Sequence, residues 1–259
     1  MKTIVPLISA LATLTVSSAL AQTTYTDPLG DNYGGPEVDI SSVTVFNDAS
    51  NITFKVNMNP AADLGVNHYA NYEIGIQVGN GAGGQTAING TYGTGNPAAG
   101  NPYGNAVGIS TGENFFIGSF LDSPGNYSGG AQLYSYSAVA GWTQIGGTAP
   151  ITEIYTGTPS TAFTFSLASL GLTVGSSFNF DVYTTFGSPQ GAYDALDNNG
   201  LGSGTAPYSG GTYDSATAPG STFATTIYTI QAAPEPGTCA LLGLGALGMM
   251  GSLRRRHAK

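Results

Sequence analysis

The central part of this 259-residue chain is almost without basic side chains and is without cysteine. Residues 22–233 contain one lysine, Lys55, and no arginine, against 14 acidic side chains. This balance excludes nucleic-acid binding, because the neutralisation of phosphates requires Lys and Arg. It favours solubility and the binding of cations. The one cysteine of the chain, Cys239, lies beyond this part, so residues 22–233 form no internal disulfide.

Side chains that carry catalysis are scarce as well. Residues 22–233 hold one histidine, His68, whose surroundings Gly65-Val-Asn-His-Tyr69 do not resemble a nucleophile elbow or its partners. A pair of carboxylates for glycoside hydrolysis stays open, since spacing in the sequence cannot identify one. We predict that the protein is not an enzyme and assign no catalytic residue. A polysaccharide-acting hydrolase is the alternative.

The N-terminus has the three-part layout of a secretory signal peptide. Lys2 supplies a positive charge, residues 4–16 form an apolar run, and Ala19-Leu20-Ala21 is a small-x-small cleavage site. The apolar run is too short to span a bilayer as a permanent helix. We therefore predict a signal helix over residues 1–21, cleavage after Ala21, and export.

The C-terminus combines a proline-bounded motif, an apolar run over residues 239–253, and a basic cluster. The motif is Pro234, Glu235 and Pro236, and the cluster is Arg254, Arg255 and Arg256. The prolines stiffen the chain before the apolar run, and the arginines stay on the cytoplasmic side of a membrane. Because the run is shorter than the roughly 20 residues of a full span, we predict an anchor helix that inserts transiently in the inner membrane.

This order of motif, apolar run and arginines over residues 234–259 resembles the PEP-CTERM sorting signal. The resemblance implies that exosortase, a membrane transpeptidase, cuts near the motif and passes the protein to the surface or extracellular matrix. It further implies a Gram-negative bacterium that makes exopolysaccharide, which becomes an expected partner. An ordinary C-terminal membrane anchor is the alternative. A sorting signal indicates where a protein goes and little about what it does there.

Period-two alternation dominates residues 22–233, which we expect to form one domain. Ile52, Phe54, Val56 and Met58, for example, alternate with polar residues, and a strand places such apolar side chains on one face. The candidate strands are 38–46, 51–58, 72–78, 115–121, 132–140, 151–155, 163–167, 178–182 and 223–230. One buried face and one wet face are typical of antiparallel sheets.

Two such sheets stacked through their apolar faces make a β-sandwich. We therefore predict an all-β, antiparallel sandwich, jelly-roll or immunoglobulin-like, with about nine or ten strands. Helix is expected only as a single turn at residues 167–172. Two long connections, 79–106 and 187–220, are rich in Gly, Asn, Ser, Thr and Tyr. They are predicted to be either binding loops or disordered segments.

The domain resembles the DOMON-like, family 9 carbohydrate-binding type of β-sandwich. The resemblance rests on the opening Asp27-Pro-Leu-Gly-Asp31 before paired strands, and on Leu170-Gly-Leu172 before the core strand Phe178-Asn-Phe-Asp-Val182. It implies a carbohydrate-binding module with a defined glycan ligand as the alternative to a surface or matrix protein. It also implies that the early acidic segment contributes to a structural calcium site.

Two acidic clusters are candidates for such a site, because hard cations take several carboxylate and carbonyl oxygens. The first cluster is Asp27, Asp31 and Asp39, and the second is Asp194, Asp197 and Asn199. The second lacks the closing Glu of an EF-hand loop. Turn formation by Asp, Asn and Gly is the alternative for both clusters. Structural Ca²⁺ is the one cofactor that we predict.

Sugar sites use flat aromatic faces beside polar side chains, and the chain offers several aromatic residues for this role. We name Trp142, Tyr193 and Tyr208 as candidate platforms. A core position is the favoured alternative for Trp142, because large aromatic side chains are mostly buried.

Overall fold

The structure of the protein is a computed structural model that describes residues 22–64, 70–88, 102–120, 130–146, 159–185, 191–198 and 213–232. These residues belong to a unit, Ala21–Ala232, that is compact by itself. Their regular structure consists of strands and short 3₁₀ turns, which confirms the prediction of an all-β protein. The predicted signal helix and the predicted anchor helix lie outside the described residues. Within the described ranges, no helix has the length and apolarity needed to cross a membrane.

A four-stranded antiparallel sheet forms one layer. Its strands, in the order β1-β2-β3-β9, are β1 (Gln22–Thr26), β2 (Ile40–Asn47), β3 (Asn51–Met58) and β9 (Ser160–Ser166). The β2–β3 turn closes through Asp48, whose Oδ1 accepts the backbone N–H groups of Ser50 and Asn51, both at 2.7 Å. These bonds hold the pKa of Asp48 below its usual value. A side chain that satisfies turn amides in this way fixes the register of the hairpin.

A seven-stranded antiparallel sheet forms the second layer. Its path runs β11-β10-β4-β6-β7-β8, and β13 pairs with β10 beside it. The strands are β4 (Asn71–Val78), β6 (Phe115–Phe120), β7 (Ala131–Ser137), β8 (Gly141–Gln144), β10 (Ser177–Thr185), β11 (Asp194–Ala195) and β13 (Ile227–Thr229). A short parallel pair, β5 (Val107–Gly108) and β12 (Tyr213–Asp214), stands apart from both sheets.

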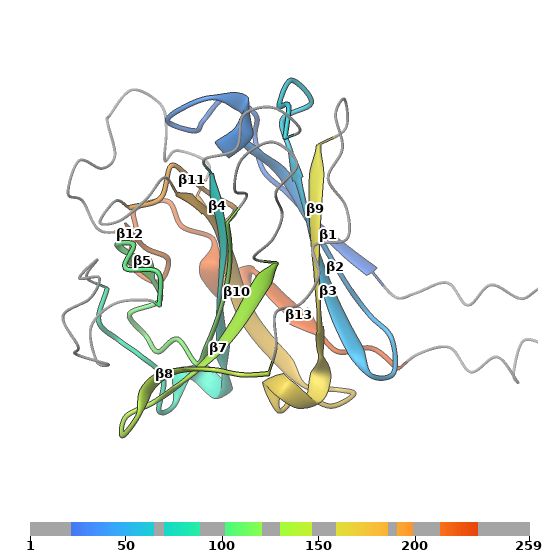
Figure 1. The fold of residues 1–259 in the computed structure, drawn as a ribbon, viewed down its shortest axis with the longest axis vertical. Coiled ribbons are helices and arrows are strands. Elements are labelled where there is room, and N and C mark those ends of the chain that lie inside the picture. Colours follow the sequence, from blue (N-terminus) through green and yellow to red (C-terminus); the bar gives the residue numbers. More distant parts are fainter. Residues whose placement is uncertain are drawn as a thin grey trace, which may run out of the picture. The chain divides into compact units, whose positions relative to one another are not determined.

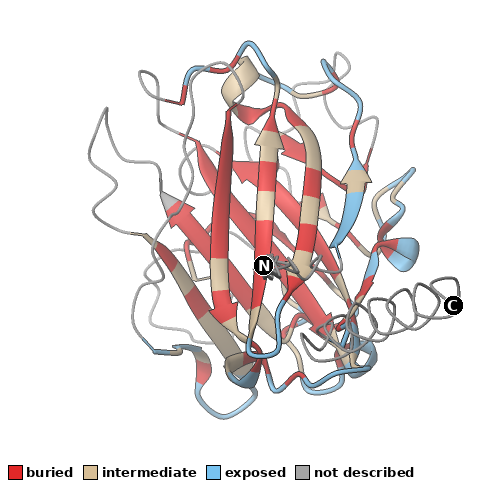
Figure 2. Ribbon diagram, turned by 90° about the vertical axis from the view of Figure 1, so that its right-hand side faces the viewer, coloured by how far each residue is buried: buried red, intermediate tan, exposed pale blue. Residues whose placement is uncertain are grey.

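The hydrophobic core lies between the two sheets. Phe54 of β3 packs against Phe178 and Phe180 of β10, with ring centroids 6.2 and 5.6 Å apart. Apolar side chains from both sheets belong to the same buried cluster, and the facing strands are buried over most of their length (Figure 2). The arrangement in Figure 1, with two layers facing across this core, confirms the predicted β-sandwich.

The polar outer face of the seven-stranded sheet was predicted to be exposed to solvent, but the structure shows that it is covered. Glu73 on β4 and Asp181 on β10 are fully buried there. Figure 1 shows β5 and β12 on the side of β4 and β10 that faces away from the four-stranded sheet. Connecting segments therefore form a third, irregular layer over this face, and the polar alternation of its strands indicates hydrogen bonding rather than exposure.

Most predicted strands are confirmed to within a few residues, but two predictions were wrong in detail and some strands were not predicted. Residues 132–140 form β7 only up to Ser137 before a turn leads into β8, which was not predicted. Residues 223–230 begin as a 3₁₀ turn, Phe223–Thr225, and only then form β13. β1 was missed as well, because its Thr-rich sequence does not alternate. The predicted strand 151–155 lies outside the described residues.

The single helical turn is confirmed as the 3₁₀ helix Leu167–Leu170. The Ser166 hydroxyl accepts the backbone N–H of Ser169 at 3.0 Å and caps its start. Gly171 ends it at φ +63°, a backbone conformation that favours glycine. Three further 3₁₀ turns in the described residues are Pro36–Val38, Gly79–Gly81 and Phe223–Thr225.

Candidate cation site

Three buried aspartates from two distant segments of the chain meet at one end of the sandwich. Asp27 directly follows β1, and its backbone N–H donates to the carbonyl of Ser41 at 3.1 Å. Asp31 lies four residues further along the same loop, and Asp194 begins β11 at the edge of the other sheet. One carboxylate oxygen of each residue lies within 4.8 Å of the others. The cluster therefore joins the two sheets.

Asp27 and Asp31 have no protein partner for their charge. All four of their carboxylate oxygens are buried and receive no hydrogen bond, although the side chains are only 7% and 8% exposed. Asp194 differs, because its Oδ2 accepts the N–H of Ile40 at 2.6 Å and its Oδ1 accepts the N–H of Ala195 at 2.9 Å. Buried carboxylates without donors are rare and call for a proton or a cation.

Burial and mutual repulsion shift the titration of these groups strongly. Burial, followed by the nearby charges of Asp194 and Asp31, raises the pKa of Asp27 to about 10. Burial is also the largest cause of the raised pKa of Asp31 and of the pKa of Asp194, which lies well above its usual value. Lys55 on β3 is the one basic side chain among the described residues, and no basic group contributes to the pKa shifts of the three aspartates.

Asp39, a candidate ligand from the sequence, has a different role in the structure. Its two oxygens each accept the backbone N–H of Gly30 at 3.1 Å, and Oδ2 also accepts the Nδ2 group of Asn59 at 2.6 Å. Gly30 adopts φ +83°, which a residue with a side chain rarely reaches. Asp39 therefore shapes the loop that carries Asp27 and Asp31, and its oxygens are already satisfied by the protein.

The second sequence cluster is divided between two places. Asp194 joins Asp27 and Asp31, whereas Asp197 accepts hydrogen bonds from Tyr213 and Ser221 on the outer face of the large sheet. Asn199 lies outside the described residues. The sequence identified acids of both clusters but could not show that members of the two clusters meet, because their meeting depends on how the sheets stack.

Two of the three candidate aromatic platforms are described. Trp142 on β8 is half-buried rather than a core residue, and it packs edge-on against Tyr136 and Phe116 with ring centroids 5.4 and 6.1 Å apart. Tyr193 is half-buried beside Tyr33, with centroids 5.8 Å apart and the rings inclined by 43°. Tyr208 lies outside the described residues, and the role of all three in sugar binding stays a prediction.

Sequence reasoning missed a second group of buried acids, which includes Glu73, Glu113 and Asp181. Glu73 Oε1 accepts hydrogen bonds from Asn105 Nδ2 and, at 3.1 Å, from Thr185 Oγ1. Burial raises the pKa of Glu73 to about 8. The available signal was a single acid enclosed by apolar residues in a strand, as in Tyr72-Glu-Ile74, which period-two reasoning assigns to a wet face.

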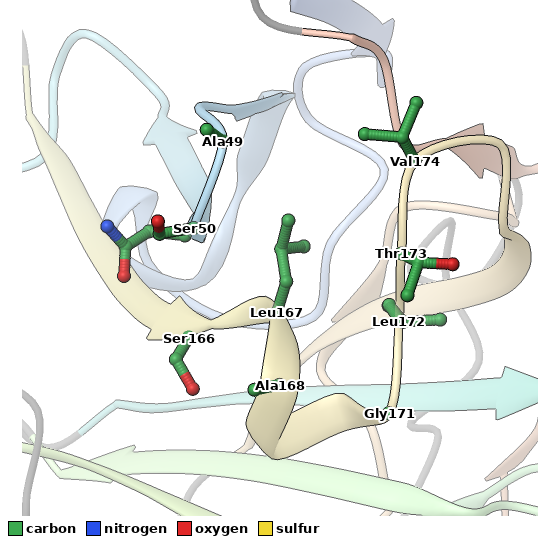
Figure 3. Close-up of a pocket in the computed structure, with 10 residues that line it drawn as sticks. Ala49, Ser50, Ser166, Leu167, Ala168, Gly171, Leu172, Thr173 and Val174 are labelled. Carbon is green, nitrogen blue, oxygen red and sulfur yellow. The ribbon is translucent and has the colours of Figure 1, made fainter.

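A pocket elsewhere on the sandwich differs from the cation cluster, because no titratable side chain lines it. The β2–β3 turn and the segment around Leu167–Val174 line it, and Figure 3 shows Leu167 between the two walls. Its ten lining residues include no acid, base or aromatic ring. The pocket therefore offers neither a metal ligand nor a stacking surface for a sugar.

The comparison with family models gives one match, the PEP-CTERM protein-sorting motif, over residues 232–256. The chain carries this motif, which confirms the resemblance at its C-terminus. The motif implies an exported protein that exosortase processes at the membrane, with a cell-surface or extracellular destination. The matched range contains all three parts of the predicted signal, namely Pro234–Pro236, the apolar run 239–253 and Arg254–Arg256, which lie outside the described residues.

The other comparisons add little. No curated protein sequence matches the chain. Three chains of solved structures match. One comes from a study titled "pH-induced modulation of Streptococcus parasanguinis adhesion by Fap1 fimbriae"; it is 12% identical, with 66% of this chain and 76% of that chain covered and a TM-score of 0.22. A TM-score this low supports no argument about fold or function. The DOMON-like resemblance stays a prediction.

Proposed function

We propose that this is a non-catalytic protein of the cell surface or extracellular matrix of a Gram-negative bacterium, associated with exopolysaccharide and locked by a structural calcium ion. The observation that carries the proposal is the cluster Asp27, Asp31 and Asp194, with four buried carboxylate oxygens that receive no hydrogen bond. The sorting motif supplies the destination.

A cation accounts for the cluster better than protons do. Each buried polar atom without a partner costs roughly 1–3 kcal/mol, and protonation leaves at least one lone-pair oxygen per carboxyl group unpaired. A divalent cation instead contacts all three groups at once. Ca²⁺ binds oxygens at about 2.3–2.6 Å, so ligands on opposite sides of it lie about 4.6–5.2 Å apart. Oxygens within 4.8 Å of one another fit one such shell.

The burial and the arrangement of the three carboxylates also favour calcium over magnesium. Mg²⁺ demands near-ideal octahedral geometry at about 2.0–2.1 Å and retains several waters. The three carboxylates here are buried and come from two separate segments of backbone, which suits the larger and more tolerant ion. A bound Ca²⁺ would connect the loop after β1, on one sheet, with β11 on the other.

The burial of these acids also argues against hydrolysis. A catalytic carboxylate must reach the scissile bond, and the oxygens of Asp27 and Asp31 are closed off from solvent. We therefore favour a structural or adhesive role in the matrix over hydrolysis at this cluster. One observation favours the alternative of a defined glycan ligand: Tyr33 is 44% exposed and stands beside Tyr193, next to the cation cluster.

Thermal melts of the secreted domain, residues 22–232, test the calcium site. Ligand at 100 times its dissociation constant adds about 2.7 kcal/mol, which for a domain of this size is roughly 5–10 °C in Tm. We expect this gain with CaCl₂ and its loss with EDTA. Asp31→Asn should abolish the response, and the exposed Asp63→Asn should keep it. An EDTA-insensitive wild-type Tm would exclude the site.

Binding to polysaccharide needs a separate measurement. Affinity gel electrophoresis of the same domain through gels containing neutral and acidic exopolysaccharides, with and without calcium, measures it directly. Retardation that Tyr33→Ala abolishes would support a defined glycan site. Retardation that the substitution leaves unchanged would support general association with the matrix, and no retardation in any gel would remove the polysaccharide from the proposal.

A further inference from the structure

The chain leaves the folded domain beside the uncharged pocket between the β2–β3 turn and the segment around Leu167–Val174. We name it the exit pocket, and its lining consists of residues 49–51, 166–168 and 171–174. Gln231 is tied to the first wall, because its backbone N–H donates to Asn47 Oδ1 at 3.0 Å and its carbonyl accepts Asn47 Nδ2 at 2.9 Å. Ile230 is tied to the second wall, because its carbonyl accepts the N–H of Gly175 at 2.9 Å. The last residues of the domain therefore lie next to both walls.

The exit pocket is a formed apolar recess of about 830 Å³. The backbone N–H of Leu167 donates to the carbonyl of Ser50 at 2.8 Å and joins the two walls, as Figure 3 shows from the side of Leu167. Val174 is 56% exposed on the second wall, and Ala49 is exposed on the first. Exposed apolar surface rimmed by polar residues is typical of interaction sites. In a domain with 14 acids and one base, an uncharged recess suits an apolar group of a partner rather than an ion.

The beginning of the domain lies at the same end as the exit pocket. Gln22, the first residue after the predicted signal peptide, pairs with Phe46 at the end of β2. Asp27 of the cation cluster lies at the other end of β2, where it bonds Ser41. Eight residues of strand separate the two ends by roughly 24 Å, and Figure 1 shows the β2–β3 turn and the end of β9 at the lower end of their sheet. Both segments that engage the export machinery thus join the domain at one end, away from the cation cluster.

The length of the chain brings the sorting enzyme to this end. The motif begins at Pro234, three residues after Gln231, and ends at Pro236. Because a residue spans at most about 3.6 Å, these prolines lie within roughly 11 and 18 Å of Gln231. An enzyme that acts on the motif must come equally close to Gln231, so that its surface faces the exit pocket.

We propose that the exit pocket is a docking site for exosortase, which holds the folded domain by an apolar group while it acts on the motif. The enzyme is a membrane protein that the sorting motif requires at this place, and the pocket offers it an uncharged surface on an otherwise acidic domain. Docking keeps the motif at a high effective concentration near the active site. The chain is then recognised twice, by its motif and by its fold, and the cation cluster stays free at the other end.

Processing of the full chain in cells that contain exosortase tests the docking site. Pulse labelling follows the conversion of the precursor into the processed protein. Val174→Asp places a charge on the pocket wall and should slow the conversion by roughly tenfold, as expected for a central residue of an interface. Val139→Asp is the matched control, because Val139 is 96% exposed in the β7–β8 turn. It should be processed like wild type, since β4, β6 and β7 separate β8 from β10. Equal rates for the two variants would overturn the proposal.

The stability of the variants separates docking from folding. Val174 is more than half exposed, so Val174→Asp should leave the Tm of residues 22–232 unchanged. Ala49→Gln repeats the test from the other wall of the pocket and should slow processing as well, so a folding defect in one variant does not decide the result. Wild-type processing of either variant at an unchanged Tm would contradict the docking site. It would instead indicate that the pocket is empty or holds a small molecule during sorting.

A longer connection to the motif tests the same contact without a change in the pocket. Ten Gly and Ser residues inserted between Ala232 and Ala233 lengthen the connection from Gln231 to Pro236 about threefold. The effective concentration of the motif then falls by roughly fivefold, and processing of the wild-type domain should slow accordingly. The insertion should have no further effect in Val174→Asp, because that domain no longer docks. Equal slowing in both proteins, or in neither, would show that recognition rests on the tail alone.

Cross-linking identifies the occupant of the pocket. A photoreactive phenylalanine derivative in place of Val174 should form a covalent adduct with epitope-tagged exosortase, and the same derivative in place of Val139 should not. An adduct with a second copy of the chain, or no adduct with the enzyme, would overturn the proposal. This result is independent of the proposed calcium ion, because the cation cluster lies at the opposite end of β2. Failure of the docking site therefore leaves the calcium site standing, and the melts in EDTA leave the docking site standing.

Discussion

Calcium should reduce the loss of stability that this protein suffers as the pH rises. A group whose pKa is raised in the folded state stabilises the fold fully below its unfolded pKa, and this contribution is lost as pH rises through the folded pKa. For Asp27 the window runs from 3.8 to about 10, and for Glu73 from 4.5 to about 8. Without calcium, the domain should therefore become less stable from pH 5 to 7, where most proteins reach their maximum stability.

The expected change in the free energy of unfolding follows from the number of protons that the folded state retains and the unfolded state loses. Each proton that only the folded state retains changes the free energy of unfolding by about 1.4 kcal/mol per pH unit. Between pH 5 and 7, Asp27 alone contributes about 2.7 kcal/mol and Glu73 a similar amount. Calcium displaces the proton from Asp27, because a ligating carboxylate must be ionised. The slope in calcium should therefore be smaller by at least about 1.4 kcal/mol per pH unit.

Urea unfolding at pH 5, 6 and 7, in EDTA and in CaCl₂, measures both slopes. Glu73→Gln serves as the matched control. It removes the contribution of one proton from the pH dependence both in EDTA and in CaCl₂, so the difference between the two slopes should stay unchanged. Asp31→Asn should make the two slopes equal by removing the cation. Equal slopes in the wild-type protein would refute the reasoning, since they would show that calcium and the protons do not compete for the cluster.

Four further substitutions, one of them an exposed control, test the packing of the sandwich by urea unfolding. Phe54→Ala, in contact with two rings of the opposite sheet, should cost about 3–5 kcal/mol, whereas Val139→Ala, 96% exposed, should change stability by less than about 0.5 kcal/mol; similar values would contradict the assigned core. Asn47→Ala removes a buried amide that bonds the Tyr228 hydroxyl at 2.7 Å and should cost roughly 2–4 kcal/mol. A Cβ at Gly118 would lie 2.2 Å from the ring next to it, so Gly118→Ala should cost about 1–3 kcal/mol; an unchanged midpoint would show that the ring moves freely.

The sandwich was predictable because its strands carry the signal locally. The alternation in residues 51–58 is enough to define β3 and its buried face, and the same holds for β4 and β10. Two-residue strands such as β11 and β12 carry no such pattern, since two residues cannot show a period. Their positions depend on the sheet against which they fold, which no local sequence window contains.

The candidate site was half predictable for the same reason. The acid-rich segment around Asp27 and the run after Asp194 each have a local signal, and both were named. That Asp194 joins the first cluster, while Asp39 and Asp197 are satisfied by protein donors, depends on the pairing of β11 with β10 and of β1 with β2. Glu73 and Asp181 were missed because alternation indicates which face a residue occupies but cannot show that a further layer covers that face.

Two solutions to the same problem stand a few residues apart in this domain. The carboxylate oxygens of Asp27 and Asp31 receive no hydrogen bond, so a cation is the natural partner. Asp181 and Asp197 instead accept hydrogen bonds from the protein. A calcium ion between Asp27 and Asp194 also closes a loop of about 167 residues, and a permanent cross-link of that size stabilises by roughly 5 kcal/mol through the entropy of the unfolded chain. In an exported domain without cysteine, the ion would therefore act in the place of a disulfide. Its affinity need only match the 10⁻⁴–10⁻³ M typical of extracellular modules, so that the sheets would be clamped after export and not before.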